Sequence, residues 1–160
     1  MKRSASARTG ERSAPSVDFD ELPTYVGYQV RRAQARIFSE FEASLRDLDF
    51  TPGSFGVLTL IRANPGITQG ALAAAFGVDK STMSPVVFGL ESRGLVRRQV
   101  LASDRRRHAL FFAEGAEATY RAARGKVRAF EAGVAARLSK SEQRELARLL
   151  VKLQGSADVA

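Results

Sequence analysis

The chain has no cysteine and no tryptophan, and its 160 residues include a single histidine, His108. The absence of thiols excludes disulfides, thiolate metal sites and cysteine-based redox sensing. A metal site would have to combine His108 with carboxylates alone, which is a poor ligand set for the common transition metals. We therefore predict no metal centre and no cofactor.

Long apolar runs and enzymatic motifs are missing as well. No stretch approaches the ~18 consecutive apolar residues of a membrane-spanning helix, and the N-terminus has no apolar core of a secretory signal. There is no Gly-rich phosphate loop, and no serine stands in a recognisable nucleophile context. We expect a cytoplasmic protein without catalytic residues.

Positive charge is what the chain has in excess. Lys and Arg number 25 against 17 Asp and Glu, which gives a formal net charge of +8. Such an excess favours a polyanionic partner, although surface solubility accounts for part of it. The length suits one domain, or one half of a tight dimer.

The stretch from residue 77 to residue 100 predicts a short helix followed by a strand. Asp79 is a good N-cap, because its carboxylate accepts from the free amides of the first turn. Gly94 supplies the positive φ that ends the helix. The buried face is predicted from the apolar spacing of Met83, Val87 and Leu90.

Neighbouring segments extend this helix into a larger motif. Residues 68–76 predict a second short helix, and the turn at 77–78 makes the pair a helix-turn-helix. Two predicted strands, 95–100 and 108–112, flank residues 102–107, which carry three consecutive arginines. A hairpin with arginines at its tip forms a wing suited to the narrow, negative minor groove.

Candidate DNA contacts follow from this geometry. Small, hydroxyl-bearing side chains at the helix start suit base edges, and the candidates are Ser81, Thr82, Ser84 and Pro85. Thr82 has an alternative role as a second capping hydroxyl. Phosphate contacts are expected from Lys80, Arg97 and Arg98, and wing contacts from Arg105, Arg106 and Arg107. We expect Phe88 to pack beneath the wing, and a wedge inserted into the DNA is its alternative role.

Segments outside the motif predict an arm, a tail and long helices. Residues 1–18 predict a disordered basic arm, either a DNA contact or a solvated tail. Residues 22–48 and 114–137 predict helices, and Ser139 with Glu142 predicts a capping box that opens a third. The last helix has an apolar stripe suited to a second copy of the chain, formed by Leu146, Leu149, Leu150 and Leu153.

The sequences GVDKSTMSPVVFGLESRGLVRR and SDRRRHALFF together resemble the winged helix-turn-helix of MarR-type transcriptional regulators. The resemblance runs from about Leu22 to Leu153. It implies a mainly α fold with a small β-wing, in which residues 51–113 bind DNA, residues 19–50 and 114–154 dimerise, and residues 155–160 form a flexible tail. Family members often carry arginines where this chain has Pro85 and Gly89, and a capping Thr where it has Ala113.

The resemblance also implies a function. It predicts a homodimeric, sequence-specific regulator, a repressor released from a palindromic operator by an aromatic acid or its coenzyme A thioester. It places Arg106 in the minor groove, with Arg105 and Arg107 beside it. The implied ligand site is Tyr25, Tyr28, Gln29, Arg32, Arg36, Phe55, Leu58 and Phe111, although these aromatics could be core residues and the arginines a solvated face. Because fold alone does not decide function, a winged helix that binds protein is the alternative.

Overall fold

The computed structural model describes residues 17–101 and 104–155, with only the backbone for 101 and 104–107. The chain divides into two compact units, Met1–Gln34 and Ala35–Ala160. The predicted arm at 1–18 and tail at 155–160 lie almost wholly outside the described residues. The helix predicted at 22–48 is found as η1 (Leu22–Thr24), α1 (Val26–Leu45) and η2 (Arg46–Leu48), so the boundary between the units falls inside α1.

The first unit is held by contacts between near neighbours in the sequence. The Tyr25 hydroxyl donates to Glu21 at 2.8 Å, and the Gln29 amide donates to the Pro23 carbonyl at 2.6 Å. The Arg32 guanidinium lies 5.8 Å from the centre of the Tyr28 ring. No side chain is buried among residues 17–34, the part of this unit that the structure describes.

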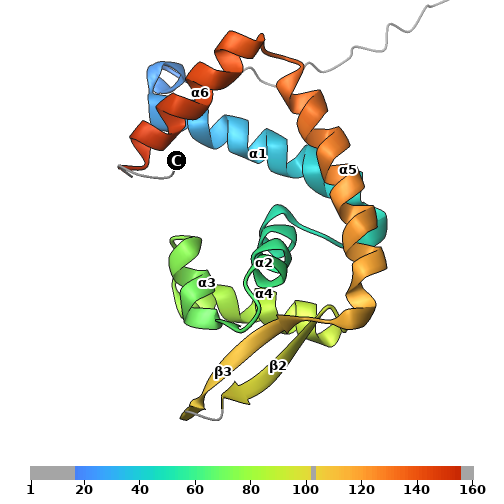
Figure 1. Ribbon diagram of the computed structural model, residues 1–160. Coiled ribbons are helices and arrows are strands. Elements are labelled where there is room, and N and C mark those ends of the chain that lie inside the picture. Colours follow the sequence, from blue (N-terminus) through green and yellow to red (C-terminus); the bar gives the residue numbers. More distant parts are fainter. Residues whose placement is uncertain (1–16, 102–103, 156–160) are drawn as a thin grey trace, which may run out of the picture. The chain divides into compact units, whose positions relative to one another are not determined.

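The second unit contains the predicted helix-turn-helix and wing (Figure 1). Its elements after η2 are α2 (Pro52–Ala63), β1 (Ile67–Thr68), α3 (Gln69–Ala75), α4 (Lys80–Ser92), β2 (Val96–Leu101), β3 (Asp104–Phe112), η3 (Glu114–Ala116), α5 (Glu117–Ala135) and α6 (Lys140–Leu153). The predicted fold class, mainly α with a small β-wing, is confirmed.

Side-chain caps open most helices of this unit, and those at Asp79 and Ser139 are the ones that the sequence predicts. Asp79 accepts from the Thr82 amide at the start of α4, and Thr51 caps α2 ahead of Pro52. Ser139 and Glu142 form the predicted capping box of α6. Gly94 has a φ of +68°, which ends α4 and turns the chain into β2. These boundaries are set locally, because each depends only on residues within one turn.

The sheet is antiparallel in the order β1–β3–β2. Its register pairs Val96 with Phe112 and Val100 with His108, but Leu101 pairs with Asp104. Three residues of β3, 105–107, therefore fall between two successive pairs, as a bulge. The prediction that they form a loop between the strands is wrong: β3 already begins at Asp104, because the backbone pairing with β2 extends beyond the apolar residues on which the strand was predicted.

The core lies among α2, α3, α4, the sheet and α5. The side chains of Leu58, Ile61, Leu72 and Leu90 are at most 1% exposed, and Phe41 and Leu45 of α1 join them. The ring of Phe55 stacks on that of Tyr120, with centroids 5.8 Å apart and planes 8° apart. By contrast, α6 buries none of its residues.

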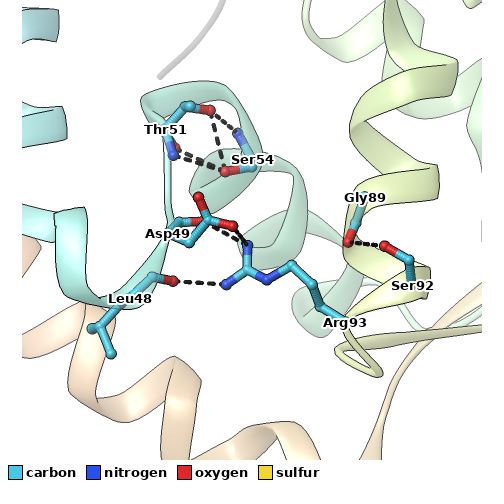
Figure 2. Close-up of polar contacts among 7 residues, drawn as sticks. All are labelled: Leu48, Asp49, Thr51, Ser54, Gly89, Ser92 and Arg93. Carbon is cyan, nitrogen blue, oxygen red and sulfur yellow. Dashed lines mark hydrogen bonds and ion pairs between the residues drawn. The ribbon is translucent and has the colours of Figure 1, made fainter.

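Arg93, at the C-terminal end of α4, connects that helix to the segment before α2 (Figure 2). Its guanidinium donates to the Leu48 carbonyl at 2.7 Å and to the Asp49 carbonyl at 2.6 Å. The same group lies 4.6 Å from the centre of the Phe50 ring. Since backbone carbonyls in such a turn lack helical partners, this one side chain satisfies two of them and fixes α4 against the core.

Candidate nucleic-acid interface

Helix α4 has one buried face and one open face. Met83, Val87 and Leu90 are at most 3% exposed, as predicted. Every predicted contact residue on this helix is exposed: Lys80, Ser81, Thr82, Ser84 and Pro85. The packing of α4 against the core therefore presents its short polar side chains and Lys80 to the outside together.

The start of α4 is a compact hydrogen-bonded turn. Asp79 Oδ1 accepts from the Thr82 amide at 2.7 Å and from the Ser81 hydroxyl at 2.6 Å. The Ser81 hydroxyl is the largest cause, and the Thr82 amide the next, of the lowering of the Asp79 pKa to about 2. The carboxylate is thus charged at neutral pH. Because Ser81 donates its only hydroxyl hydrogen to Asp79, it offers a base edge acceptor lone pairs.

Arg97 and Arg98, both predicted phosphate contacts, have different surroundings. The Arg98 guanidinium forms two bonds to the Glu91 carboxylate, at 2.9 Å and 2.7 Å. These bonds raise the pKa of Arg98 and tie β2 to α4. The Arg97 guanidinium lies 4.6 Å from the centre of the Phe111 ring. Both arginines are exposed, but each already contacts another side chain of this chain. Fewer side-chain orientations are therefore open to them for phosphate contacts than the sequence suggested.

A cavity of about 700 Å³ lies beside the start of α4. Two of the predicted phosphate contacts, Lys80 and Arg98, line it together with residues that were not predicted: Thr68, Gln69, Gly70, Ala71 and His108. Gln69 donates to the Lys80 carbonyl at 3.3 Å, which links α3 to α4. The position of Thr68 and Gln69 at a helix start was readable from the sequence, but their proximity to β3 was not.

Phe88 does not pack beneath the wing, and that prediction is wrong. Its side chain is 69% exposed, more than any other described aromatic residue. The helical repeat explains the error, because the wing and the core take the face of α4 that carries Met83, Val87 and Leu90. Phe88 lies on the opposite face, with Ser81, Ser84 and Pro85.

The wing arginines, Arg105 to Arg107, stand on β3 within the bulge. Their side chains are outside the described residues, so their roles stay predictions.

The predicted ligand residues are divided between the units. Tyr25, Tyr28, Gln29 and Arg32 belong to the first, where they make the local contacts described above. In the second, Leu58 is fully buried and Phe55 is half-buried against Tyr120. Arg36 is exposed and pairs with Glu40 at 2.8 Å. The Phe111 ring lies against the guanidinium of Arg97. Each of these side chains thus already has a structural role, and the ligand site stays a prediction.

The part of the chain that the structure describes contains no cluster of three or more His, Asp or Glu side chains arranged to hold a metal ion. Among the described helices, none has the length and apolar character needed to cross a membrane.

Comparison with known proteins places this architecture in a family. The model of the MarR family matches residues 50–108. A putative transcriptional regulatory protein for the hcr operon of Thauera aromatica is 37% identical over 130 residues, covering 80% of this chain and 78% of that protein. The transcriptional repressor Rv2887 of Mycobacterium tuberculosis is 33% identical over 134 residues, covering 84% and 95%.

Solved structures are similar over most of the chain. The transcriptional repressor CouR bound to a 23-mer DNA duplex has a TM-score of 0.81 and 30% identity, covering 88% of this chain and 99% of that one. CouR bound to p-coumaroyl-CoA has a TM-score of 0.80 and 28% identity, covering 87% and 98%. Rv2887 in complex with p-aminosalicylic acid has a TM-score of 0.63 and 32% identity, covering 82% and 99%. The chain belongs to the MarR family of transcriptional regulators.

Proposed function

We propose that this protein is a homodimeric repressor that binds a palindromic operator through α4 and the β2–β3 wing, and leaves it when a small molecule binds. The observation that carries the proposal is the open surface of α4, which presents Ser81 and Ser84 away from the buried face, with Lys80 and Thr82 exposed beside them in the first turn. A helix of this kind suits the major groove, where base edges are read.

Charge and similarity support the same conclusion. The net charge of +8 suits a polyanion, and Lys80 is exposed beside a cavity that Arg98 and His108 also line. The similar repressor CouR has been solved on a DNA duplex. In this proposal Lys80, Arg97 and Arg98 contact phosphates, and Pro85 contacts a base edge.

The dimer is proposed from α6. Four leucines on one side of this helix, Leu146, Leu149, Leu150 and Leu153, are between 36% and 62% exposed within a single chain. Four neighbouring exposed leucines favour a covered surface, because removing contiguous apolar side chains from water is favourable. A second copy covers it symmetrically, and a two-fold dimer matches the two half-sites of a palindrome. Residues 19–50 and 114–154 would form the dimerisation region, and 51–113 the DNA-binding domain.

The effector is proposed from the relatives and from the resemblance. CouR and Rv2887 have been solved with p-coumaroyl-CoA and p-aminosalicylic acid, both of which contain an aromatic ring and an anionic group. An aromatic acid or its coenzyme A thioester is therefore the class we propose, with Arg32 and Arg36 as candidate partners of the anion. A thermal-shift series with p-coumarate, its coenzyme A thioester and free coenzyme A tests this. The compounds that raise the melting temperature show whether the protein recognises the aromatic acid, the coenzyme A part or both.

The wing is proposed to reach the minor groove through Arg106. A minor-groove arginine gains most where the groove is narrow and A·T-rich. Arg106→Ala should therefore lose more affinity on operators with A·T flanks than on the same core with G·C flanks. Equal losses for the alanine variants of Arg105, Arg106 and Arg107 on both flanks would instead indicate diffuse positive charge.

Fluorescence anisotropy on operator and random duplexes tests the core of the proposal. Thr82→Ala should reduce the preference for operator by about 1 kcal/mol, the value of one hydrogen bond. Lys80→Ala should weaken binding to both duplexes and reduce the salt slope by about one unit. If both variants lose equally on both duplexes, the assignment of base and phosphate contacts is wrong.

The same anisotropy measurement distinguishes the proposed DNA-binding function from the alternative, a winged helix that binds protein. It predicts a flat anisotropy response to any duplex at low and at moderate salt. The exposed Lys80 and the hydroxyl groups at the start of α4 argue against this alternative. A helix that binds protein does not need a cation placed to meet a phosphate.

A further inference from the structure

Phe88 is an exposed aromatic side chain on the helix that the proposed function places in the major groove. At about 100° per residue, Phe88 lies within about 20° of Ser81, two turns earlier on α4. Ser84 and Pro85 lie between them, so these four side chains form one strip along the open face. Phe88 and Pro85 make the far end of this strip apolar, whereas its beginning is polar.

Nothing in the described structure covers this apolar end. Phe88 is 69% exposed, and the next residue is Gly89, where an added Cβ would have no neighbour within 4 Å. The buried face of the helix does not need the ring, because Met83, Val87 and Leu90 complete the core. The Phe88 ring is therefore free to contact an apolar group of a partner, beside the residues proposed to contact base edges.

The major groove has one apolar group to offer such a ring, the C5-methyl of thymine. Its other base-edge groups are hydrogen-bond donors and acceptors, which Ser81, Thr82 and Ser84 suit and Phe88 does not. Seven residues of helix advance by about 10.5 Å, which is about three base pairs at 3.4 Å each. The ring is thus positioned to meet a base pair near those that the polar end of the strip contacts.

We propose that Phe88, with Pro85 beside it, selects thymine in each half-site by covering its C5-methyl group. This inference rests on the proposed function, since it requires α4 to lie in the major groove. It assigns sequence preference to a side chain without a hydrogen-bonding group, and it predicts that the operator is read partly through methyl groups.

The test replaces thymine by deoxyuridine, one position at a time, in the operator duplex. Deoxyuridine keeps every base-pairing group and lacks only the methyl. Wild-type affinity should fall about fourfold for each methyl that is covered, at one or two positions per half-site. Phe88→Ala should bind the thymine operator more weakly and show no further loss at those positions. Phe88→Leu should retain part of the sensitivity.

Phe76→Ala is the matched control, because Phe76 is also exposed, at 37%, but lies at the end of α3 and outside the side chains proposed to contact DNA or the second copy. Its deoxyuridine profile should equal that of the wild type. Since Phe88 is so exposed, its alanine variant should keep the wild-type melting temperature, which a thermal scan checks.

Other outcomes overturn the inference in distinguishable ways. Identical deoxyuridine profiles for wild type and Phe88→Ala exclude methyl recognition by this ring. An equal loss on operator and random DNA places the ring against the sugar–phosphate backbone, and a change in self-association alone assigns it to a contact between copies. If the wild type does not prefer operator to random DNA, the proposed function itself fails.

Discussion

Helices α4 and α6 are similar in length and in the way they begin, but they differ in what covers them. Each opens with a side-chain cap, Asp79 in one and Ser139 in the other. Helix α4 buries three apolar residues against its own chain, whereas α6 buries none and leaves its leucines exposed. An apolar stripe therefore indicates that a face will be covered, but not whether the same chain covers it.

This difference separates two kinds of stability. Truncating the buried face of α4 should act on the folding of the single chain, and altering the stripe of α6 should act on assembly. The four predictions below test that separation, from the largest expected effect to the smallest.

The largest effect is expected from charge on the α6 stripe. Replacing both Leu149 and Leu153 by Asp would bury unpaired carboxylates at the proposed dimer interface, at a cost of several kcal/mol. Light scattering should then report monomers or aggregates. Arg144→Asp, on the opposite face of α6, is the control and should remain dimeric. A well-folded dimer of the double variant would contradict the proposed interface.

Within α4, Leu90→Ala should lower the free energy of unfolding by about 2–5 kcal/mol, because Leu90 is 1% exposed and a cavity would remain. Chemical denaturation measures this loss. The matched truncation, Leu149→Ala, should chiefly raise the dissociation constant of the dimer, measured by sedimentation. If Leu149→Ala destabilises the isolated chain as much as Leu90→Ala does, the contrast between the helices is wrong.

The end of α4 should be sensitive to Arg93. Arg93→Ala leaves the Leu48 and Asp49 carbonyls without their donor and should cost about 1.5–3 kcal/mol of unfolding free energy. Arg93→Lys should restore only part of it, because one ammonium cannot reproduce the two-pronged geometry. On α6, Arg148→Ala removes only an exposed pair with Glu145 and should change little. Equal losses for the two alanine variants would refute a special role for Arg93.

The smallest effect concerns the start of α4 and depends on pH. Asp79 has a pKa of about 2 in the folded protein, against an ordinary value of 3.8. Its carboxylate therefore stabilises the fold fully above about pH 4 and loses that contribution as the pH falls towards 2. Asp79→Ala should be less stable than wild type at neutral pH, with a gap that narrows in this range.

Asp79→Ser is the matched control for that titration, because serine caps a helix without ionising. Its stability, measured by thermal scans from pH 7 to pH 2, should lie near that of the wild type at neutral pH. Comparing variants at each pH removes the contribution of other carboxylates with lowered pKa values, such as Glu40 and Glu142. A gap that stays constant down to pH 2 would contradict the role given to the Asp79 charge.

Much of the fold could be predicted because its signals are local. The caps at Asp79 and Ser139, the left-handed glycine at 94 and the buried spacing of α4 were all read correctly. Each of these depends on residues within one or two turns of the helix. The three consecutive arginines have no apolar alternation that would predict a strand. The start of β3 was therefore predicted at residue 108, whereas the strand begins at Asp104.

The candidate site was only partly readable for the same reason. The exposure of Ser81 and Ser84 at the start of α4 follows from the helical repeat, which is a property of the sequence. The pairing of Arg98 with Glu91 and the approach of His108 to the cavity beside Lys80 depend on where the sheet packs against α4. No spacing in the sequence encodes that placement.

The sequence by itself determined which helices form, where they begin and which face of each is apolar, because hydrogen bonding and side-chain periodicity act between near neighbours. Only the tertiary structure decided which apolar faces this chain covers. It buried Leu90 and left Phe88 and the α6 leucines open, since one compact core has room for only some of the faces that the sequence makes apolar.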